Sequence, residues 1–162
     1  MANTIPLTMK INGKEETFSA APETSLLRFL RDNFYYEVKC GCEEGDCGTC
    51  TVLLDGVAVK SCITLAHACA GHEVWTVKGL GYNDELAARL QKSFVESGAI
   101  QCGFCTPGFI IAALHYIKNG GKADRKAIRS AISGNLCRCT GYMKIVDAIY
   151  NVAKELEEGG LS

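Results

Sequence analysis

Cysteine is the residue type in this chain whose number and spacing point to chemistry. Ten cysteines occur among 162 residues, which raises the question of disulfides, metal sites or reactive thiols. Eight of them form two sets of four, enough in each set for a metal site or an iron-sulfur cluster. The first set is Cys42, Cys47, Cys50 and Cys62, and the second is Cys102, Cys105, Cys137 and Cys139.

The first set has the spacing C-x4-C-x2-C followed later by Cys62, which is the plant-ferredoxin arrangement of ligands for a 2Fe-2S cluster. Gly41, Gly45 and Gly48 accompany these cysteines. Glycine lets a backbone fold tightly and turn its N–H groups toward an anionic cluster, whose charge they stabilise. Structural zinc is the alternative, but zinc ribbons favour two separated C-x2-C knuckles. The spacing therefore favours iron-sulfur over zinc.

The second set is a C-x2-C pair and a C-x-C pair, each just ahead of a predicted helix. Two helix N-termini facing one anion would stabilise it through their dipoles. The segment 102–105 also resembles a thioredoxin-like dithiol. That motif needs a preceding strand in a parallel sheet, whereas an all-helical half is predicted here, and Cys137 and Cys139 would have no role. We therefore expect a second cluster.

Two cysteines remain outside the sets. Only Cys42, and not Cys40, gives the ferredoxin spacing, so Cys40 and Cys69 are expected to be small buried hydrophobic residues. The histidines form no pair at ligand spacing and are expected to be structural or surface residues, and the tryptophan is expected in the core: His67, His72, His115 and Trp75.

Composition excludes several classes of protein. The chain is 48% hydrophobic and 22% charged with a net charge of -1, which argues against disorder and a collagen-like fibre. Its 17 basic and 18 acidic residues give no nucleic-acid footprint, and no apolar run reaches the roughly 20 residues of a membrane span. Residues 1–14 lack the pattern of a secretory signal, so we expect a cytoplasmic protein with reduced thiols.

The first half of the chain has the pattern of a small mixed sheet. Asn12-Gly13 and Asp55-Gly56 are dipeptides of tight hairpin turns, and Thr24 is expected to cap a short helix at 24–31. The expected strands are two within 4–20, then 51–54, 57–60 and 74–77. A domain boundary is expected at the glycine-rich segment 79–81.

The second half changes to helical periodicity. Asp84 begins one helical segment and Asp124 is the expected cap of another, and Thr106-Pro107 supplies a cap and a first-turn proline for a third. A fourth apolar stripe covers 145–156. Four short amphipathic helices suggest a bundle. Cys-Thr-Pro-Gly-Phe at 105–109 and Cys-Thr-Gly-Tyr at 139–142 suggest weak pseudo-symmetry within it.

The cysteine segments together resemble the small iron-sulfur subunit of molybdenum hydroxylases, the xanthine oxidase family. The resemblance rests on 41–50, Ser61-Cys62, 101–108 and 134–142. It implies an α+β chain with an N-terminal beta-grasp, plant ferredoxin-like domain at 1–80. A C-terminal four-helix-bundle domain at 81–162 follows, and each domain holds one 2Fe-2S cluster.

The same resemblance implies partner subunits: a large one with molybdenum and molybdopterin, and a medium one with FAD. It implies that the helical-domain cluster lies next to the pterin, with Gln101 and Cys139 in contact. The sequence itself has no base beside a nucleophile, no phosphate-binding loop and no flavin motif. We therefore expect electron transfer from the molybdopterin centre through two clusters toward FAD, with a purine or another N-heterocycle as the substrate of the complex.

Two other functions are compatible with the cysteines. A free-standing two-cluster ferredoxin would carry electrons among many partners, although a second cluster buried in a bundle suits fixed wiring better. A zinc-stabilised interaction module would be colourless. A visible and EPR spectrum with iron and sulfide analysis distinguishes the three.

Overall fold

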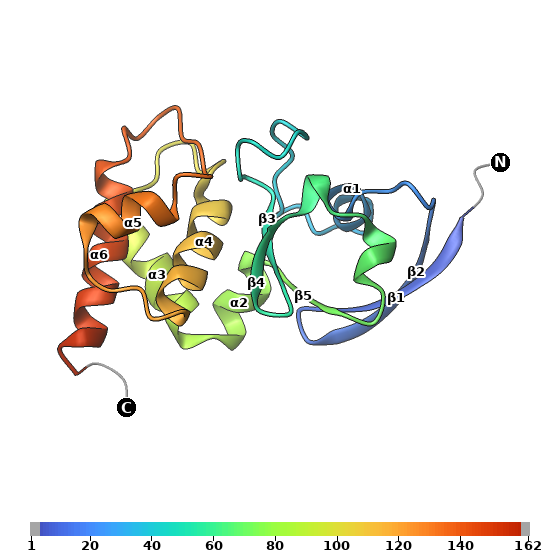
Figure 1. The fold of residues 1–162 in the computed structure, drawn as a ribbon, viewed down its shortest axis with the longest axis horizontal. Helices are drawn as coiled ribbons and strands as arrows, with labels where there is room; N and C mark the ends of the chain where they lie inside the picture. The colour runs from blue at the N-terminus through green and yellow to red at the C-terminus, as the bar shows by residue number, and fades with distance from the viewer. Residues whose placement is uncertain (1–3, 160–162) are drawn as a thin grey trace.

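The computed structural model describes residues 4–159. Its first half is a five-stranded mixed sheet with one α-helix, and its second half is helical (Figure 1). The first three residues of the predicted domain 1–80 and the last three of the predicted domain 81–162 lie outside the described residues. The α+β class expected from the sequence is confirmed.

The sheet has the strand order β2-β1-β5-β3-β4. β1 and β2 form the expected hairpin around Asn12-Gly13, where both residues have positive φ. β5 is parallel to β1 and antiparallel to β3. The strands are β1 (Ile5–Ile11), β2 (Lys14–Ala20), β3 (Thr51–Leu54), β4 (Val57–Lys60) and β5 (Glu73–Trp75). The last strand ends two residues earlier than predicted, because Thr76 caps the next helix.

Helix α1 (Leu26–Asp32) packs on this sheet. Its Leu26, Leu27 and Leu30 are fully buried in one cluster with the alternate residues Leu7 and Met9 of β1. The predicted cap, Thr24, is wrong by one residue. Ser25 is the N-cap, and its Oγ accepts the N–H of Arg28 at 3.2 Å.

Up to residue 159, the second half contains five helices where four were predicted. Helices α3 to α6 correspond to the predicted ones, and α2 is an additional helix that includes the glycine-rich segment 79–81. Asp124 caps α5 as expected, and Asp84, expected only to begin a helical segment, is the N-cap of α3. Thr106 is instead the first residue of α4, and Cys105 occupies the cap position without a side-chain bond. The helices are α2 (Val77–Asn83), α3 (Glu85–Glu96), α4 (Thr106–Lys118), α5 (Arg125–Ala131) and α6 (Met143–Glu157).

The two halves are in direct contact, with α4 against β3 (Figure 1). Leu53 of β3 belongs to the same buried cluster as Phe109 of α4. A Cβ atom on Gly108 would lie 2.2 Å from the carbonyl oxygen of Gly48, so this approach requires glycine. The buried Asn135 also donates to the Gly48 oxygen at 2.9 Å. The first cysteine loop is thereby fixed to the start of α4.

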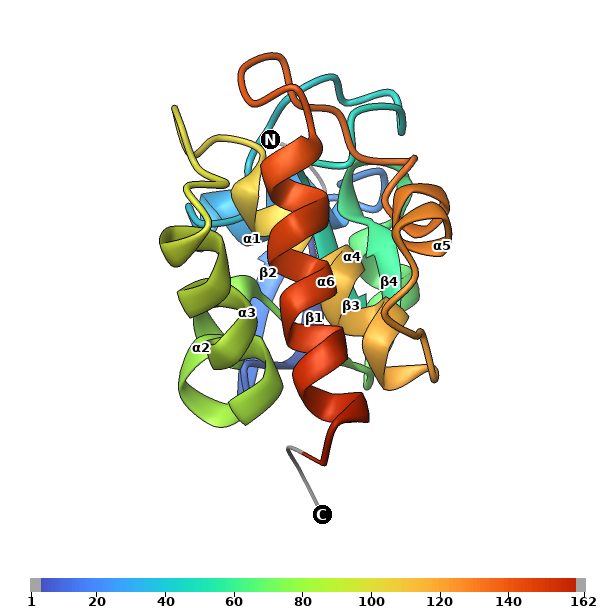
Figure 2. The same cartoon turned by 90° about the vertical axis from the view of Figure 1, so that its left-hand side faces the viewer.

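All the loops that carry the second cysteine set, and the loop of Cys42 and Cys47, lie at one end of the molecule (Figure 1). Viewed from the helical side, these loops lie beyond the N-terminal end of α6 (Figure 2). The fold therefore brings cysteine loops that lie between 32 and 97 residues apart in the sequence to a common end. None of the helices within 4–159 is long and apolar enough to cross a membrane.

Candidate iron-sulfur sites

The first cysteine set lies in the loop before β3 and on the short 3-10 turn Ser61–Ile63, which carries Cys62. Cys42 Sγ accepts the backbone N–H groups of Glu44 and Cys47, each at 3.4 Å. The thiols of Cys62 and Cys50 are near enough to affect each other's protonation, and Cys42 is near enough to interact with Cys62 electrostatically. The loop therefore folds as expected around its cysteines and turns N–H groups toward sulfur.

These contacts lower the pKa of one cysteine in the first set and raise the pKa of another. The N–H groups of Cys47 and Glu44 stabilise the thiolate and lower the pKa of Cys42 to about 6. Burial, together with the neighbouring Cys50, raises the pKa of Cys62 to about 11. A thiolate, the form that binds metal, is thus favoured at Cys42 by backbone donors and no basic side chain is needed.

The second set joins two loops of the helical half, the one between α3 and α4 and the one between α5 and α6. Cys105 is the residue before α4, and the loop before α6 supplies Cys137 and Cys139. The sulfurs of Cys139 and Cys102 are 3.6 Å apart, and the thiols of Cys105 and Cys137 are near enough to affect each other's protonation. All four cysteines that the sequence grouped are therefore brought together.

Hydrogen bonds again favour one thiolate in each close pair of the second set. The N–H of Phe104, followed by the thiol of Cys139, lowers the pKa of Cys102. Burial raises the pKa of Cys105 to about 12. Burial would also raise the pKa of Cys137, but donors led by the Thr140 hydroxyl outweigh it and lower this pKa. Thr140 donates from Oγ1 at 3.1 Å and from its N–H at 3.4 Å, a role that the sequence motif did not reveal.

The arrangement of the sulfurs tests whether a binuclear cluster fits. In both sets the thiols form two close pairs, and within 4–159 no three His, Cys, Asp or Glu side chains are arranged to hold a single metal ion. A 2Fe-2S cluster takes two thiolates on each iron, whereas tetrahedral zinc needs four ligands around one point. The pairs are Cys42 with Cys47, Cys50 with Cys62, Cys102 with Cys139, and Cys105 with Cys137. The residues present fit two binuclear clusters.

One cavity of about 260 Å³ connects the two sets. Cys42 and Cys47 line it from the first set, and all four cysteines of the second set line it as well. Phe104 and Leu136 are the apolar side chains in its wall. The two candidate centres therefore face a common space.

The second set also reaches the protein surface. Cys102 and Cys139 are exposed, whereas Cys105 and Cys137 are buried. Gln101, the other residue expected to meet the pterin, is exposed beside Cys102. One pair of the second set is thus accessible from outside while the other faces the interior.

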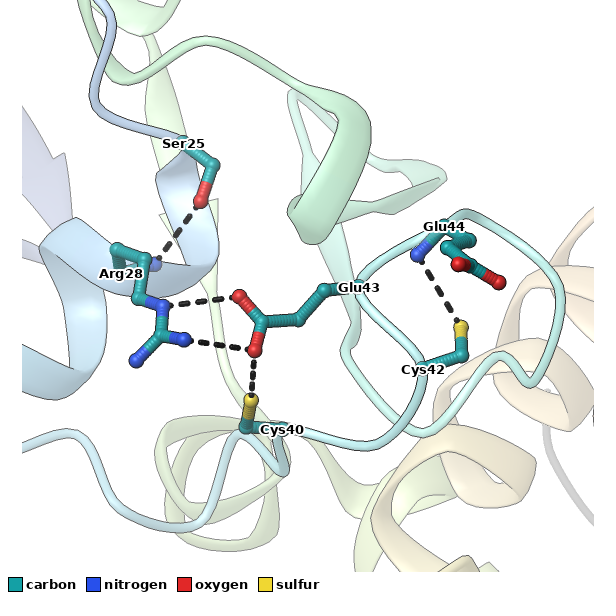
Figure 3. Close-up of polar contacts among 6 residues, drawn as sticks. All are labelled: Ser25, Arg28, Cys40, Cys42, Glu43 and Glu44. Atoms are coloured by element: carbon teal, nitrogen blue, oxygen red, sulfur yellow. Dashed lines mark hydrogen bonds and ion pairs between the residues drawn. The ribbon is translucent and has the colours of Figure 1, made fainter.

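Cys40 and Cys69 were both expected to be small buried hydrophobic residues, which is confirmed for Cys69 and corrected for Cys40. Cys69 is completely buried. Cys40 packs against the core of the first half but is only partly buried, and its thiol donates to Glu43 Oε1 at 3.0 Å (Figure 3). Glu43 is in turn paired with Arg28. Nothing in the local motif indicated this contact, since Arg28 lies on a different element.

The remaining candidates play structural roles. His67 Nε2 is hydrogen-bonded to the Ala20 carbonyl at 3.1 Å, and His72 Nδ1 lies 2.5 Å from Asp55 Oδ2. Trp75 is partly buried against the helical core. His115 lies in the last turn of α4.

Comparisons with known proteins agree with this geometry. Residues 9–73 match the family model for a 2Fe-2S iron-sulfur cluster binding domain, and residues 76–150 match that for a [2Fe-2S] binding domain. The xanthine dehydrogenase iron-sulfur-binding subunit of Escherichia coli O157:H7 is 40% identical over 94% of this chain and 97% of its own length. The chain belongs to the small 2Fe-2S subunits of the xanthine oxidase family of molybdenum hydroxylases.

Solved structures give the same assignment for this small 2Fe-2S subunit. It covers 99% of a chain of quinoline 2-oxidoreductase from Pseudomonas putida 86, with 40% identity and a TM-score of 0.89. In the aldehyde oxidoreductase of Desulfovibrio gigas, the similar region is 17% of a longer chain, with 36% identity and a TM-score of 0.85. The small 2Fe-2S subunit is therefore a non-catalytic, electron-transferring part of an oxidoreductase family, with two 2Fe-2S-binding domains.

Proposed function

We propose that the eight cysteines of the two sets ligate two 2Fe-2S clusters that conduct electrons within a molybdenum hydroxylase complex. Cys42, Cys47, Cys50 and Cys62 hold the N-terminal cluster, and Cys102, Cys105, Cys137 and Cys139 hold the C-terminal cluster. Each cluster, when bound, accepts and releases one electron at a time. The chain supplies position, burial and N–H donors.

The observation that carries this proposal is the shared cavity between the two sets. An electron carrier with two centres needs them close together and held at a fixed separation. The contacts of Gly48 with Gly108 and Asn135 supply that rigidity. A mobile electron carrier that uses only one cluster at a time would gain nothing from a rigid junction between two clusters.

The exposure of the second set supports an order for the two clusters. Because Cys102 and Cys139 are exposed, the C-terminal cluster is the one that can approach a centre in another subunit. We propose that it receives electrons from a molybdopterin centre in a large subunit, with Gln101 and Cys139 at the contact. The N-terminal cluster then passes them toward FAD in a medium subunit.

A permanent partner also fits the surface around the second set. Exposed apolar side chains occur close to these cysteines in the sequence, among them Ile100, Phe104, Leu136 and Met143. A partner subunit that covered these side chains would remove their apolar surface from water, which is favourable. In the Desulfovibrio gigas enzyme the similar region is part of one long chain. In that relative, the region with this fold is therefore permanently joined to the rest of the enzyme.

For the substrate of the complex we propose a purine or another N-heterocycle. Two of the similar proteins are named for xanthine and quinoline, both nitrogen heterocycles. We further propose a cytoplasmic location and two domains, 1–80 and 81–162. In the second domain, helices α3 to α6 would form a four-helix bundle, which their mutual packing supports.

Purification from the native cell tests the proposal. A mild affinity purification of this chain is expected to retain molybdenum and flavin in a fixed ratio to its iron. The purified complex should also oxidise an N-heterocycle with reduction of an added electron acceptor. Recovery of a lone chain that exchanges electrons with several unrelated proteins would contradict it and favour the ferredoxin alternative.

A further inference from the structure

The loop that carries Cys42 is tied to helix α1 by a forked ion pair (Figure 3). Arg28 donates from Nε to Glu43 Oε2 at 2.9 Å and from Nη2 to Oε1 at 2.7 Å. The Cys40 thiol donates to the same Oε1 at 3.0 Å. A single carboxylate, on the residue that follows Cys42, thus joins the loop to α1 and to its own preceding segment.

Arg28 is a rigid anchor for this contact. It lies in the first turn of α1, and its N–H is bonded to the capping oxygen of Ser25 (Figure 3). Its neighbours Leu27 and Phe29 are fully buried in the core of the first half. The guanidinium therefore extends from a backbone that cannot shift without disturbing that core.

Glu43 holds an unfavourable backbone conformation. Its φ is +61°, in the left-handed region where a side chain meets the following carbonyl. A residue remains in such a conformation only where its surroundings determine it. The bonds of the Glu43 carboxylate to Arg28 and Cys40 are surroundings of this kind.

The conformation of Glu43 sets the direction of the next peptide group. The N–H of that group belongs to Glu44 and donates to Cys42 Sγ at 3.4 Å (Figure 3). N–H donors to cluster sulfurs stabilise negative charge and are among the groups that set the potential of an iron-sulfur cluster. A change at the carboxylate of Glu43 is therefore transmitted to the sulfur of Cys42.

We propose that Arg28, Glu43 and Cys40 form a positioning clamp that aims the Glu44 N–H at Cys42 and thereby raises the reduction potential of the N-terminal cluster. The inference rests on the proposed ligation of that cluster by Cys42. None of the three clamp side chains needs to touch the cluster. They act through the backbone between Cys42 and Glu44.

Removing each charge of the clamp in turn separates this role from simple electrostatics. If charge alone mattered, Arg28→Ala would lower the potential and Glu43→Ala would raise it, because the two residues have opposite signs. The clamp predicts that both variants lower it, because each one releases the Glu44 amide. Glu44→Gln is the matched control: it removes one negative charge from the adjacent residue, whose side chain has no hydrogen bond or ion pair within 4–159.

The experiment is a redox titration of the full chain, followed through the EPR signal of the N-terminal cluster, with the rate of iron loss to a chelator measured in parallel. Arg28→Ala and Glu43→Ala should both shift the potential downward and lose iron roughly three- to fivefold faster, the scale of a half-exposed ion pair. Glu44→Gln should shift it upward with an unchanged rate of iron loss. The EPR signal of the C-terminal cluster in the same sample reports whether each variant is folded.

Arg28→Lys gives a second route if Arg28→Ala does not fold. Lysine keeps the positive charge and is compatible with the helix, but it cannot donate the two parallel hydrogen bonds that Arg28 makes to Glu43. It should lower the reduction potential of the N-terminal cluster by less than Glu43→Ala does. Shifts of opposite sign for the Arg28 and Glu43 variants, or no change in either, would overturn the clamp and leave the proposed function standing. A wild-type chain without an N-terminal cluster signal would overturn both.

Discussion

The backbone N–H of Leu136 donates to the carbonyl oxygen of Cys47 at 2.9 Å. Cys47 belongs to the first cysteine set, and Leu136 immediately precedes Cys137 of the second. One hydrogen bond therefore links a candidate ligand of one cluster to the neighbour of a candidate ligand of the other. The same junction contains the buried Asn135, which donates to Gly48 next to Cys47.

Asn135→Ala should loosen this junction. The variant loses one buried hydrogen bond to Gly48, so the free energy of unfolding should fall by about 1–2 kcal/mol. The magnetic interaction between the two reduced clusters should weaken while the iron content stays the same. Asn151→Ala, on the exposed side of α6, is the control for the loss of an asparagine. An unchanged interaction in Asn135→Ala would show that Asn135 does not fix the separation of the clusters.

Gly48→Ala should have a larger effect at the same place. Its new Cβ would lie 2.4 Å from the Gly134 carbonyl oxygen, an overlap that should cost about 1–3 kcal/mol beyond the cost of positive φ. Gly56→Ala is the matched control for the cost of positive φ. Gly56 has φ +82°, close to the +70° of Gly48, and no atom lies within 4 Å of its Cβ position. Thermal unfolding of the two variants checks this difference. Equal destabilisation would mean that the two halves are not closely packed at Gly48.

The two clusters should respond separately to ligand changes. Cys47→Ser should remove only the EPR signal of the N-terminal cluster, and Cys137→Ser only that of the C-terminal cluster, because the candidate ligand sets share no residue. Iron content should fall to about half in each. Cys40→Ala and Cys69→Ala should keep both signals. Loss of a cluster in Cys40→Ala would mean that the register of the first ligand set is wrong.

Met143→Glu should weaken the association with the large subunit. Met143 is 56% exposed at the start of α6, in the region proposed to meet the molybdopterin subunit. A carboxylate there would lose its hydration on association, and Arg129 Nη2, which lies 3.5 Å from Met143 Sδ, would offset only part of that cost. We expect full iron content but loss of molybdenum on affinity purification. Tyr82→Glu is the control, because Tyr82 is 83% exposed on α2, at the opposite end from the cysteine loops. Equal retention of molybdenum in both variants would place the interface elsewhere.

Sequence patterns correctly predicted those turns and helix starts that depend on residues close together in the chain. Asn12-Gly13 and Asp55-Gly56 predicted both hairpins, Asp84 predicted the start of α3, and Asp124 predicted the cap of α5. The strict spacing of the cysteines grouped all eight correctly in space. Each of these features depends on residues only a few positions apart or on a known ligand motif.

Helix α2 was missed because its stability comes from contacts distant in the sequence. Gly79 and Gly81 are poor helix formers, and together they suggested a linker. In the folded chain, Thr76 caps α2 and is bonded to Asn12, and a Cβ on Gly79 would collide with the side chain of Asn12 at 2.1 Å. The glycine allows close packing on the β1–β2 turn, which no window of local sequence reveals.

The contacts of Cys40 with Glu43, and of Thr140 with Cys137, were also missed. Sequence spacing predicts the candidate ligands, but the groups that donate to those residues depend on loop conformation. The fork from Arg28 to Glu43 crosses from a helix to a loop. The environment of each cluster is therefore less predictable than its ligands.

The most direct measurement of the central claim is quantitative EPR of the dithionite-reduced chain together with iron, sulfide and zinc analysis. We predict about four irons and four sulfides per chain, with two distinct signals of about one spin each. A colourless protein that contains zinc and no sulfide would contradict the account, as would iron sufficient for only one cluster.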